Sequence, residues 1–388
     1  VVLKLQQRQQ VSHNTDNAGC CVISVRPGPS GQIASTPNSV PWTLYMATEK
    51  RDIDVEYVSE DEWNELVEAE SRANEQVRKA PKIEEPIHDI EDLAVICRKK
   101  KERVSVTDLS SMMWCEKKFE YATVLGEIVP NEIADTGSKR HQEIEEEYLR
   151  DAGLSEEVDI SVESPTDALA LRLLDSLTRL QSIFTVGKAR EVFVVGCLNA
   201  LNARGIIDCI EHNKENHYLT IRDNKTRQKP STPSQQAEKG SVLQVMSYIH
   251  MSRQLQSGEY SLDAFKKATS NLEIRELSEH FKKDVQSLGY KNLSSVDDIF
   301  QLYCEGWKCI PPVDGVGFID YEAQKTKEPL GSTTVVFTSQ HLQREIAWFE
   351  VYFSGKRHAE AVSFSDSWKC RYCSYFELCT ATPLKQPI

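Results

Sequence analysis

The sequence predicts a mixed α/β domain with one central sheet flanked by helices. Three observations predict it. Helix-like and strand-like patterns alternate between residues 104 and 352, in an order typical of a single sheet covered by helices. Two neighbouring apolar runs each end in an aspartate. Cysteines beside aromatic residues occur near the start of this region and again near the C-terminus, a pattern typical of metal ligands.

The N-terminal segment lies outside this domain. Residues 1–45 are rich in Ser, Pro, Gly and Asn and lack both helical and strand periodicity, so we expect them to be disordered. The chain starts with Val, and its first methionine is Met46. This suggests that the sequence is a fragment, or that translation begins at Met46 and leaves residues 1–45 untranslated in the native protein.

Residues 46–103 form an acidic flank that we also expect to be mostly disordered. Residues 46–95 hold 16 acidic and 6 basic side chains, a net charge of −10, whereas the whole 388-residue chain carries −13. The acidity is concentrated in the flank, so it does not exclude a nucleic-acid partner, which needs only a local basic groove. The basic run RKKKER at 98–103 is either a solvated face or a nuclear-import signal.

The folded domain is expected to span residues 104–388. Ser105 and Asp108 form a capping pattern that begins a helix continuing through Cys115 and Phe119. Amphipathic patterns predict further helices at about 137–149, 165–180, 244–255 and 340–352, and mostly helical structure at 257–312. Strand-like runs begin near residues 190, 203, 217, 315 and 332.

Two carboxylates and a lysine are the candidate catalytic residues. Asp208 ends one apolar run and Asp223 ends the next, with turn-like residues 212–216 between them. A hairpin would place the two aspartates side by side, and alternation along the strand would turn Lys225 to the face of Asp223. Such a set can bind Mg²⁺ or Mn²⁺ and hydrolyse a phosphodiester. A pattern this short also occurs as surface aspartates beside a solvated lysine.

Residues on two flanking helices support the catalytic interpretation. Gly137 is expected to begin a helix, with His141 one turn further on, either as a metal ligand or as a solvated residue. Gln244 and Tyr248 lie four residues apart on the helix that follows the second aspartate. Their polar ends can face the active site; alternatively, Tyr248 is half-buried in an ordinary amphipathic helix.

Three cysteines near the C-terminus form a strong metal-binding pattern. Cys370, Cys373 and Cys379 fall within ten residues and have aromatic neighbours. Cys115, which also lies among aromatic residues, is the best fourth ligand; an iron–sulfur cluster and a zinc ion both suit four thiolates. We expect the bound metal to join the segment 368–379 to the helix of Cys115, with no other contacts between the two. Cys209 and the remaining cysteines are interpreted as ordinary thiols.

The ordered set of motifs resembles the RecB-like nucleases of the PD-(D/E)xK type, and among them the exonuclease V family of single-strand-specific DNA exonucleases. The similarity runs from about Val104 to Cys379. It is carried by the segments SVTDLSSMMWCEKKFEY, DTGSKRH, GIIDCIEH, DNKTRQKP, QVMSYI, AWFEVYF and SWKCRYCSYFELC.

The resemblance implies a PD-(D/E)xK, restriction-endonuclease-like core with helical additions clamped by a 4Fe–4S cluster. It also implies a metal-dependent, single-stranded DNA exonuclease that acts in DNA repair or genome maintenance. One departure is that the family usually has Glu and then an apolar residue where this chain has Asp223 and Asn224. The roles that the resemblance implies are catalysis by Asp208, Asp223 and Lys225; binding of Mg²⁺ or Mn²⁺ by His141, Asp208 and Asp223, with the Asn224 carbonyl as a further ligand; cluster binding by Cys115, Cys370, Cys373 and Cys379; a supporting motif of Gly137, Gln244 and Tyr248; and DNA contact by Arg227, Lys117 and Lys118.

Two alternative functions remain open at this point. One is a non-catalytic DNA-binding or scaffold protein with a nuclease fold, and the other is a zinc-stabilised nuclease acting on RNA. The expected partner is single-stranded DNA, with a single-strand-binding protein as a further candidate, and the expected state is a monomer. No stretch approaches the roughly 20 apolar residues that a membrane span needs, so no membrane partner is expected. The basic run favours the nucleus, and the nearly acid-free first 45 residues favour the mitochondrion.

Overall fold

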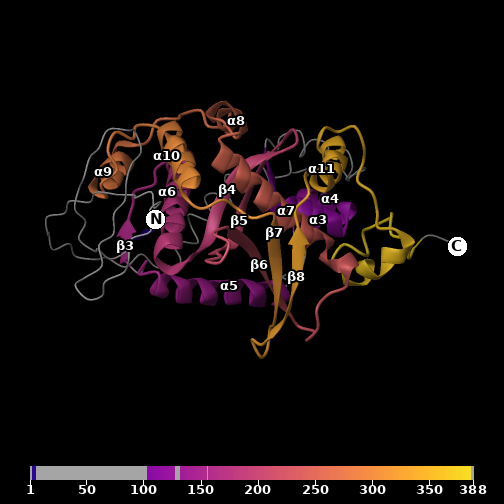
Figure 1. Cartoon of the computed structure of the whole chain (residues 1–388). Helices are drawn as coiled ribbons and strands as arrows, with labels where there is room; N and C mark the ends of the chain where they lie inside the picture. The colour runs from indigo at the N-terminus through magenta and orange to yellow at the C-terminus, as the bar shows by residue number, and fades with distance from the viewer. Residues whose placement is uncertain (1, 6–102, 127–131, 155, 386–388) are drawn as a thin grey trace.

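The computed structural model describes residues 2–5, 103–126, 132–154 and 156–385. A mixed sheet lies in the middle of the molecule, with helices around it (Figure 1). Helix α5 lies along one side of the sheet, and the C-terminal segment lies near α3, α4 and the N-terminal end of α7. The mixed α/β fold with one central sheet, predicted from the sequence, is confirmed.

The central sheet has six strands in the order β2-β5-β6-β7-β8, with β4 paired to β5. The pairs β2–β5 and β6–β7 are parallel, and the other pairs are antiparallel. The strands are β2 (Val104–Ser105), β4 (Lys188–Leu198), β5 (Leu201–His212), β6 (Leu219–Arg227), β7 (Val316–Ala323) and β8 (Pro329–Val336).

Most of the helices bury one large core against this sheet, and residues at the end of α5 form a second, small cluster. Leu243, Val245 and Ile249 of α7 belong to the same buried cluster as Ile221 of β6 and Ile319 of β7. None of the described helices combines the length and the apolar character that a membrane crossing requires. The helices are α3 (Val106–Trp114), α4 (Glu116–Leu125), α5 (Glu132–Asp151), α6 (Pro165–Val186), α7 (Gln235–Ser257), α8 (Leu262–Ala268), α9 (Glu279–Ser287), α10 (Val296–Cys309), α11 (Ser339–Phe353) and the 3₁₀ helix η1 (Phe364–Tyr372).

Two local expectations about helices are corrected. The predicted capping box is present, since the Ser105 side chain accepts from the Asp108 N–H and the Asp108 side chain accepts from the Ser105 N–H. The helix that it begins does not continue through Cys115, which has an extended backbone (φ −167°, ψ 116°) and separates α3 from α4. Gly137 does not begin its helix, because α5 starts at Glu132.

Of the N-terminal segment 1–45, the structure describes residues 2–5. Strand β1 (Val2–Leu5) pairs antiparallel with β3 (Glu156–Asp159) in a separate two-stranded sheet. Residues 6–102, which include nearly all of the acidic flank and of the basic run, lie outside the described residues.

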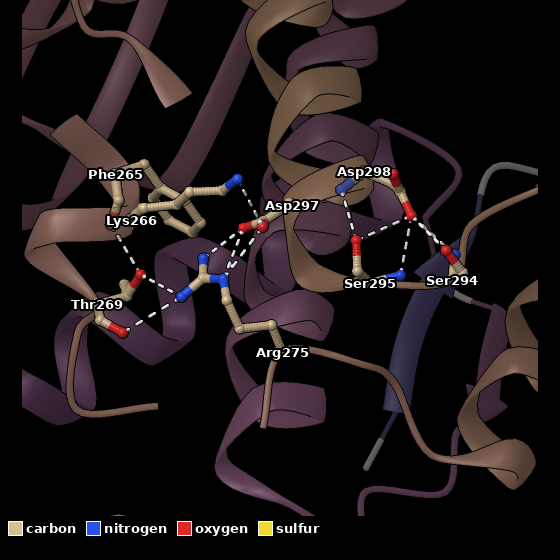
Figure 2. Close-up of polar contacts among 8 residues, drawn as sticks. All are labelled: Phe265, Lys266, Thr269, Arg275, Ser294, Ser295, Asp297 and Asp298. Atoms are coloured by element: carbon tan, nitrogen blue, oxygen red, sulfur yellow. Dashed lines mark hydrogen bonds and ion pairs between the residues drawn. The ribbon is translucent and has the colours of Figure 1, made fainter. Parts of the chain in front are cut away.

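A polar network fixes the helical addition formed by α8, α9 and α10. Figure 2 shows the guanidinium of Arg275 between the C-terminal end of α8 and the N-terminal end of α10. Its Nε donates to Asp297 at the start of α10, and its Nη1 donates to the carbonyl and the hydroxyl of Thr269 at the end of α8 (3.3 and 3.1 Å). Asp298 caps α10 by accepting hydrogen bonds from Ser294 and Ser295. The network therefore adds charge-assisted hydrogen bonds to the apolar contact of α8 with α10, where the buried Phe265 and Phe300 rings stack.

Candidate functional site

Strands β5 and β6 bring the two predicted aspartates together. The strands pair antiparallel, with Cys209 opposite Arg222. Asp208 and Asp223 are the next residues along the two strands, so they lie across from each other. The Asn224 N–H donates to Asp208 Oδ2 at 2.8 Å, which fixes this carboxylate against β6. Both side chains are buried, with relative exposures of 8% for Asp208 and 1% for Asp223.

Lys225 forms an ion pair with Asp223. Its Nζ lies 3.0 Å from both carboxylate oxygens and donates to Oδ1. Burial raises the pKa of Asp223 to about 7; the ammonium of Lys225 opposes this shift, and the charge of Asp208 adds to it. Burial acts to lower the pKa of Lys225, but the carboxylates of Asp223 and Asp208 outweigh it, so the lysine pKa lies above its usual value. Lys225 therefore stays cationic beside the two carboxyl groups.

Helix α5 places His141 at the same site. His141 Nε2 lies 3.1 Å from the Asn224 carbonyl oxygen, and Nδ1 lies 3.8 Å from Asp208 Oδ2. The helix can approach β6 this closely because Gly137, one turn earlier, has no side chain; a Cβ there would lie 3.3 Å from Thr226 Oγ1. Gly137 thus allows the backbone of α5 to lie close to β6, and it does not mark the start of the helix.

Glu191 belongs to the site although the sequence analysis did not select it. Ligand atoms of His141, Glu191 and Asp208 all lie within 4.8 Å of one another. Glu191 lies opposite Asp208 in the β4–β5 pairing and has φ +49°, a conformation that is uncommon for a residue with a side chain. Its carboxylate raises the pKa of His141, against the opposing effect of burial. Glu191 could have been found in the sequence, because it is an acid at one end of an apolar run, as Asp208 and Asp223 are.

The residues at this site fit a divalent cation. Glu191 Oε1 and Asp223 Oδ2 are buried and accept no hydrogen bond from a described residue, and the contact of Asp223 Oδ2 with Lys225 Nζ is an ion pair at 3.0 Å. Buried carboxylate oxygens without donors are costly, and a cation would satisfy them. Carboxylates with one imidazole and one main-chain carbonyl form a donor set suited to Mg²⁺ or Mn²⁺.

Gln244 and Tyr248 lie together beneath the site. Both are buried in α7, and Gln244 Nε2 donates to the Tyr248 hydroxyl at 3.3 Å. The Tyr248 ring covers Gly205 of β5 so closely that a Cβ at position 205 would lie 2.5 Å from Tyr248 Cε1. Burial raises the pKa of Tyr248, and the charges of Asp223 and Asp208 add to the shift. Gln244 and Tyr248 therefore pack against β5, the strand that carries Asp208.

The residues expected to contact DNA lie in different surroundings. The Arg227 guanidinium carbon lies 6.0 Å from the centroid of the Tyr321 ring, at the end of β6. Lys118 is half-buried and lines the pocket that contains Cys115. Lys117 lines the same pocket but is buried, and its Nζ donates to Glu120 Oε2 at 3.0 Å. The expectation of a DNA contact by Lys117 does not fit this burial.

The four predicted cysteines line a single pocket. Cys115 comes from the break between α3 and α4, Cys370 from η1, and Cys373 and Cys379 from the chain that follows η1. All four are free thiols. Burial raises the pKa values of Cys115 and Cys379, and the other thiols of the set add to each shift. The remaining lining residues are Trp114, Lys117, Lys118, Tyr121, Val362, Lys369, Tyr375, Phe376 and Thr382.

The expectation that the cysteines alone connect the two ends of the domain is wrong. Tyr121 of α4 stacks on Tyr375 (centroids 5.7 Å apart) and donates to the Leu378 carbonyl. Glu116 accepts hydrogen bonds from Trp348 Nε1, from the Arg357 guanidinium and from a main-chain N–H near it. The sequence gives no period or spacing from which contacts between residues more than 200 positions apart could be read.

The pocket chemistry fits a thiolate-bound metal centre. Four unpaired thiols from distant segments converge on it, and backbone N–H groups of Lys117 and Lys118 act to lower the pKa of Cys115. Among the described residues, no three of these sulfurs lie within 4.8 Å of one another. One tetrahedral zinc ion with Zn–S bonds of about 2.3 Å would hold its sulfurs about 4 Å apart.

Comparisons with known proteins agree on one family. The family model described as "Exonuclease V - a 5' deoxyribonuclease" matches residues 93–219, 211–303 and 312–381. Exonuclease V of Danio rerio is 26% identical over 287 residues, which cover 73% of this chain and 71% of the relative. A solved structure described as "Crystal structure of SSO0001" covers 76% of this chain and 99% of its own, with 13% identity and a TM-score of 0.31, too low to support an argument.

Proposed function

This chain belongs to the exonuclease V family, and on that premise we propose that it is a metal-dependent exonuclease of single-stranded DNA. The family description names a 5' deoxyribonuclease. The proposed role is DNA repair or genome maintenance in the nucleus or the mitochondrion. The proposed core is of the PD-(D/E)xK type.

One observation carries the proposal of catalysis. His141, Glu191 and Asp208 converge within 4.8 Å, beside the Asp223–Lys225 ion pair. His141, Glu191, Asp208 and Asp223 would hold Mg²⁺ or Mn²⁺. When bound, such an ion polarises the phosphodiester and lowers the pKa of a bound water.

The chain's own residues supply the other parts of the reaction. The Asn224 N–H holds the Asp208 carboxylate in position, and Asp223 holds Lys225 Nζ over the site. The ammonium of Lys225 would orient the attacking water or donate hydrogen bonds to the phosphate as negative charge grows on it. Replacing Lys225 by Met should therefore lower the cleavage rate about 100-fold or more while metal affinity is retained.

Exposed aromatic residues support single-stranded DNA as the substrate. Phe364 and Tyr372 on η1 have relative exposures of 72% and 78%, and Arg371 beside Tyr372 is also exposed. Unpaired bases stack on such rings, while paired bases in a duplex do not offer their faces. Helix η1 lies against the N-terminal turn of α7 through the Gln236–Asp366 hydrogen bond, and α7 also carries Gln244 and Tyr248.

A 4Fe–4S cluster is the proposed occupant of the four-cysteine pocket. The four thiols are supplied by both ends of the domain. Their spacing is wider than a single tetrahedral ion requires. Cys115, Cys370, Cys373 and Cys379 would hold the cluster, and its loading would add a covalent link to the contacts of Tyr121 and Glu116.

The test is degradation of end-labelled single strands in the presence of Mg²⁺, with linear and circular substrates of the same sequence. Linear strands should be degraded from an end and circles should persist. Cutting of circles at the same rate would contradict an exonuclease. Binding of both substrates without any cleavage, in the presence of Mg²⁺ or Mn²⁺, would instead support the non-catalytic alternative. A matched duplex and an RNA strand test the preference for single-stranded DNA.

A further inference from the structure

Two buried lysines line the four-cysteine pocket. Lys117 and Lys369 have relative exposures of 8% and 4%, and among the described residues they are the only lysines that are buried. An ammonium group is rarely buried unless nearby negative charge offsets its lost hydration. Both buried lysines line this one pocket, so the charges around each of them bear on what the pocket can hold.

Each lysine forms an ion pair with an acid three residues away. Lys117 Nζ lies 3.0 Å from Glu120 Oε2, and Lys369 Nζ lies 3.1 Å from Asp366 Oδ2. The two lysines are among the residues that line the pocket, whereas Glu120 and Asp366 are not. One pair comes from α4 and the other from η1, so the two halves of the pocket repeat the same arrangement.

The pair in α4 is the more deeply buried of the two. Glu120 has a relative exposure of 0%, and its Oε1 has no hydrogen-bond partner among the described residues. An ion pair that served packing alone would be expected to satisfy both carboxylate oxygens, since an unsatisfied buried acceptor is destabilising. The observed arrangement holds a fixed positive charge at the pocket wall and a fixed negative charge behind it.

We infer that Lys117 and Lys369 compensate the negative charge of the thiolate-bound cluster, and that the Lys117–Glu120 pair sets its reduction potential. The inference rests on the cluster proposed above. A cluster bound by four thiolates carries a net negative charge, and its reduction potential depends on the charges and hydrogen bonds around it. A buried charge acts strongly because the surrounding dielectric is low. Lys117 therefore favours the reduced, more negative state, and Glu120 disfavours it.

The test uses the full chain, purified without oxygen, and measures the midpoint potential of the cluster together with iron and sulfide per chain. Lys117→Met should shift the potential to more negative values, and Glu120→Gln should shift it to more positive values. The double variant should fall between the two. Lys117→Arg keeps the charge and should stay near wild type. Lys118→Met is the matched control, because Lys118 lines the same pocket but is half-buried, so water screens its charge.

The outcomes separate this inference from the proposed cofactor. Wild-type protein without iron and sulfide would overturn the cluster itself. A loaded wild type whose potential is unchanged by both Lys117→Met and Glu120→Gln would overturn the charge role and leave the cluster in place. Shifts of the same sign in both variants would indicate a structural disturbance and would also contradict it. If Lys117→Met does not fold, Glu120→Gln and Lys369→Met carry the test, with shifts of opposite sign expected.

Discussion

The imidazole Nε2 of His141 lies 3.1 Å from the main-chain carbonyl oxygen of Asn224. Position 224 therefore meets the site through its backbone: its carbonyl faces His141, and its N–H donates to Asp208. The Asn224 side chain takes no part in either contact. This relationship explains how the chain can carry Asn where the family usually has an apolar residue.

The first prediction follows from that backbone role. Asn224→Leu should leave the cleavage rate within about threefold of wild type, because both contacts are made by main-chain atoms. His141→Ala should lower the rate by about 100-fold, since it removes one of the proposed metal ligands. Steady-state cleavage of a labelled single strand measures both. A larger loss for Asn224→Leu than for His141→Ala would contradict the backbone role.

The second prediction concerns Asp223, whose buried carboxyl group has a pKa of about 7 instead of the usual 3.8. Asp223→Asn should abolish cleavage, with a loss of about 1,000-fold, while binding of single-stranded DNA persists, because affinity comes mainly from backbone phosphates. The same change should not lower the free energy of unfolding of the metal-free protein, since it removes a buried group that is costly to ionise.

The pH dependence of stability gives an independent measurement of the same group. A carboxyl group with a raised folded-state pKa binds a proton more tightly in the native state, so it destabilises the metal-free protein progressively as pH rises from about 4 to about 7. Urea unfolding with a chelator present measures this dependence. Between pH 5 and pH 7 the free energy of unfolding should decrease less for Asp223→Asn than for wild type. Equal decreases in the two proteins would show that Asp223 ionises without penalty.

The third prediction concerns the close approach of α7 to β5. Gly205→Ala would place a Cβ about 2.5 Å from the Tyr248 ring, so the ring or the strand must move. We expect destabilisation by about 1–3 kcal/mol together with a lower cleavage rate. Gly315→Ala is the matched control, because its Cβ would meet only the flexible end of the Arg253 side chain at 3.4 Å. Denaturant unfolding and cleavage assays on both variants decide whether the contact with Tyr248 matters more.

The fourth prediction concerns the cysteine pocket. Cys373→Ser should remove the iron of the proposed cluster, with the brown colour expected of a 4Fe–4S protein, and should weaken DNA binding and cleavage together. The domain should still fold, because Tyr121, Tyr375 and Glu116 connect its two ends directly. Circular dichroism and metal analysis test both statements.

The control for the cysteine pocket is Cys209, a buried thiol outside it. Cys209→Ala should keep the iron content and destabilise the protein by about 1 kcal/mol. Zinc without labile sulfide in the wild-type protein would contradict the iron–sulfur assignment but would not affect the nuclease site.

The fifth prediction concerns the network in Figure 2. Arg275→Met should destabilise the protein by about 2 kcal/mol, since it leaves the partly buried Asp297 without its main partner. Lys282→Met, which breaks an exposed pair with Glu279, should change the free energy of unfolding by less than about 0.5 kcal/mol. Neither substitution should change the cleavage rate per folded molecule. A loss of activity in Arg275→Met at unchanged stability would indicate that the helical addition contacts the substrate.

The features that depend on local periodicity could be predicted from the amino-acid sequence alone. The order of strands and helices follows from hydrophobic patterns, and the capping box at Ser105 and Asp108 follows from the preferences of a helix N-terminus. The shared face of Asp223 and Lys225 follows from the two-residue period of a strand. The three C-terminal cysteines were recognisable because their spacing is short. Each of these signals lies within a few residues of the chain.

Contacts between residues that are distant in the chain could not be predicted in this way. Glu191 joins His141 and Asp208 because β4 pairs with β5 and its backbone adopts a positive φ at that point, neither of which is encoded by a local pattern. The break at Cys115 and the ion pair of Glu116 with Arg357 likewise depend on the C-terminal segment packing against α4. The physical reason is that these conformations are stabilised by contacts made after the chain has folded, and such contacts leave no period in the sequence.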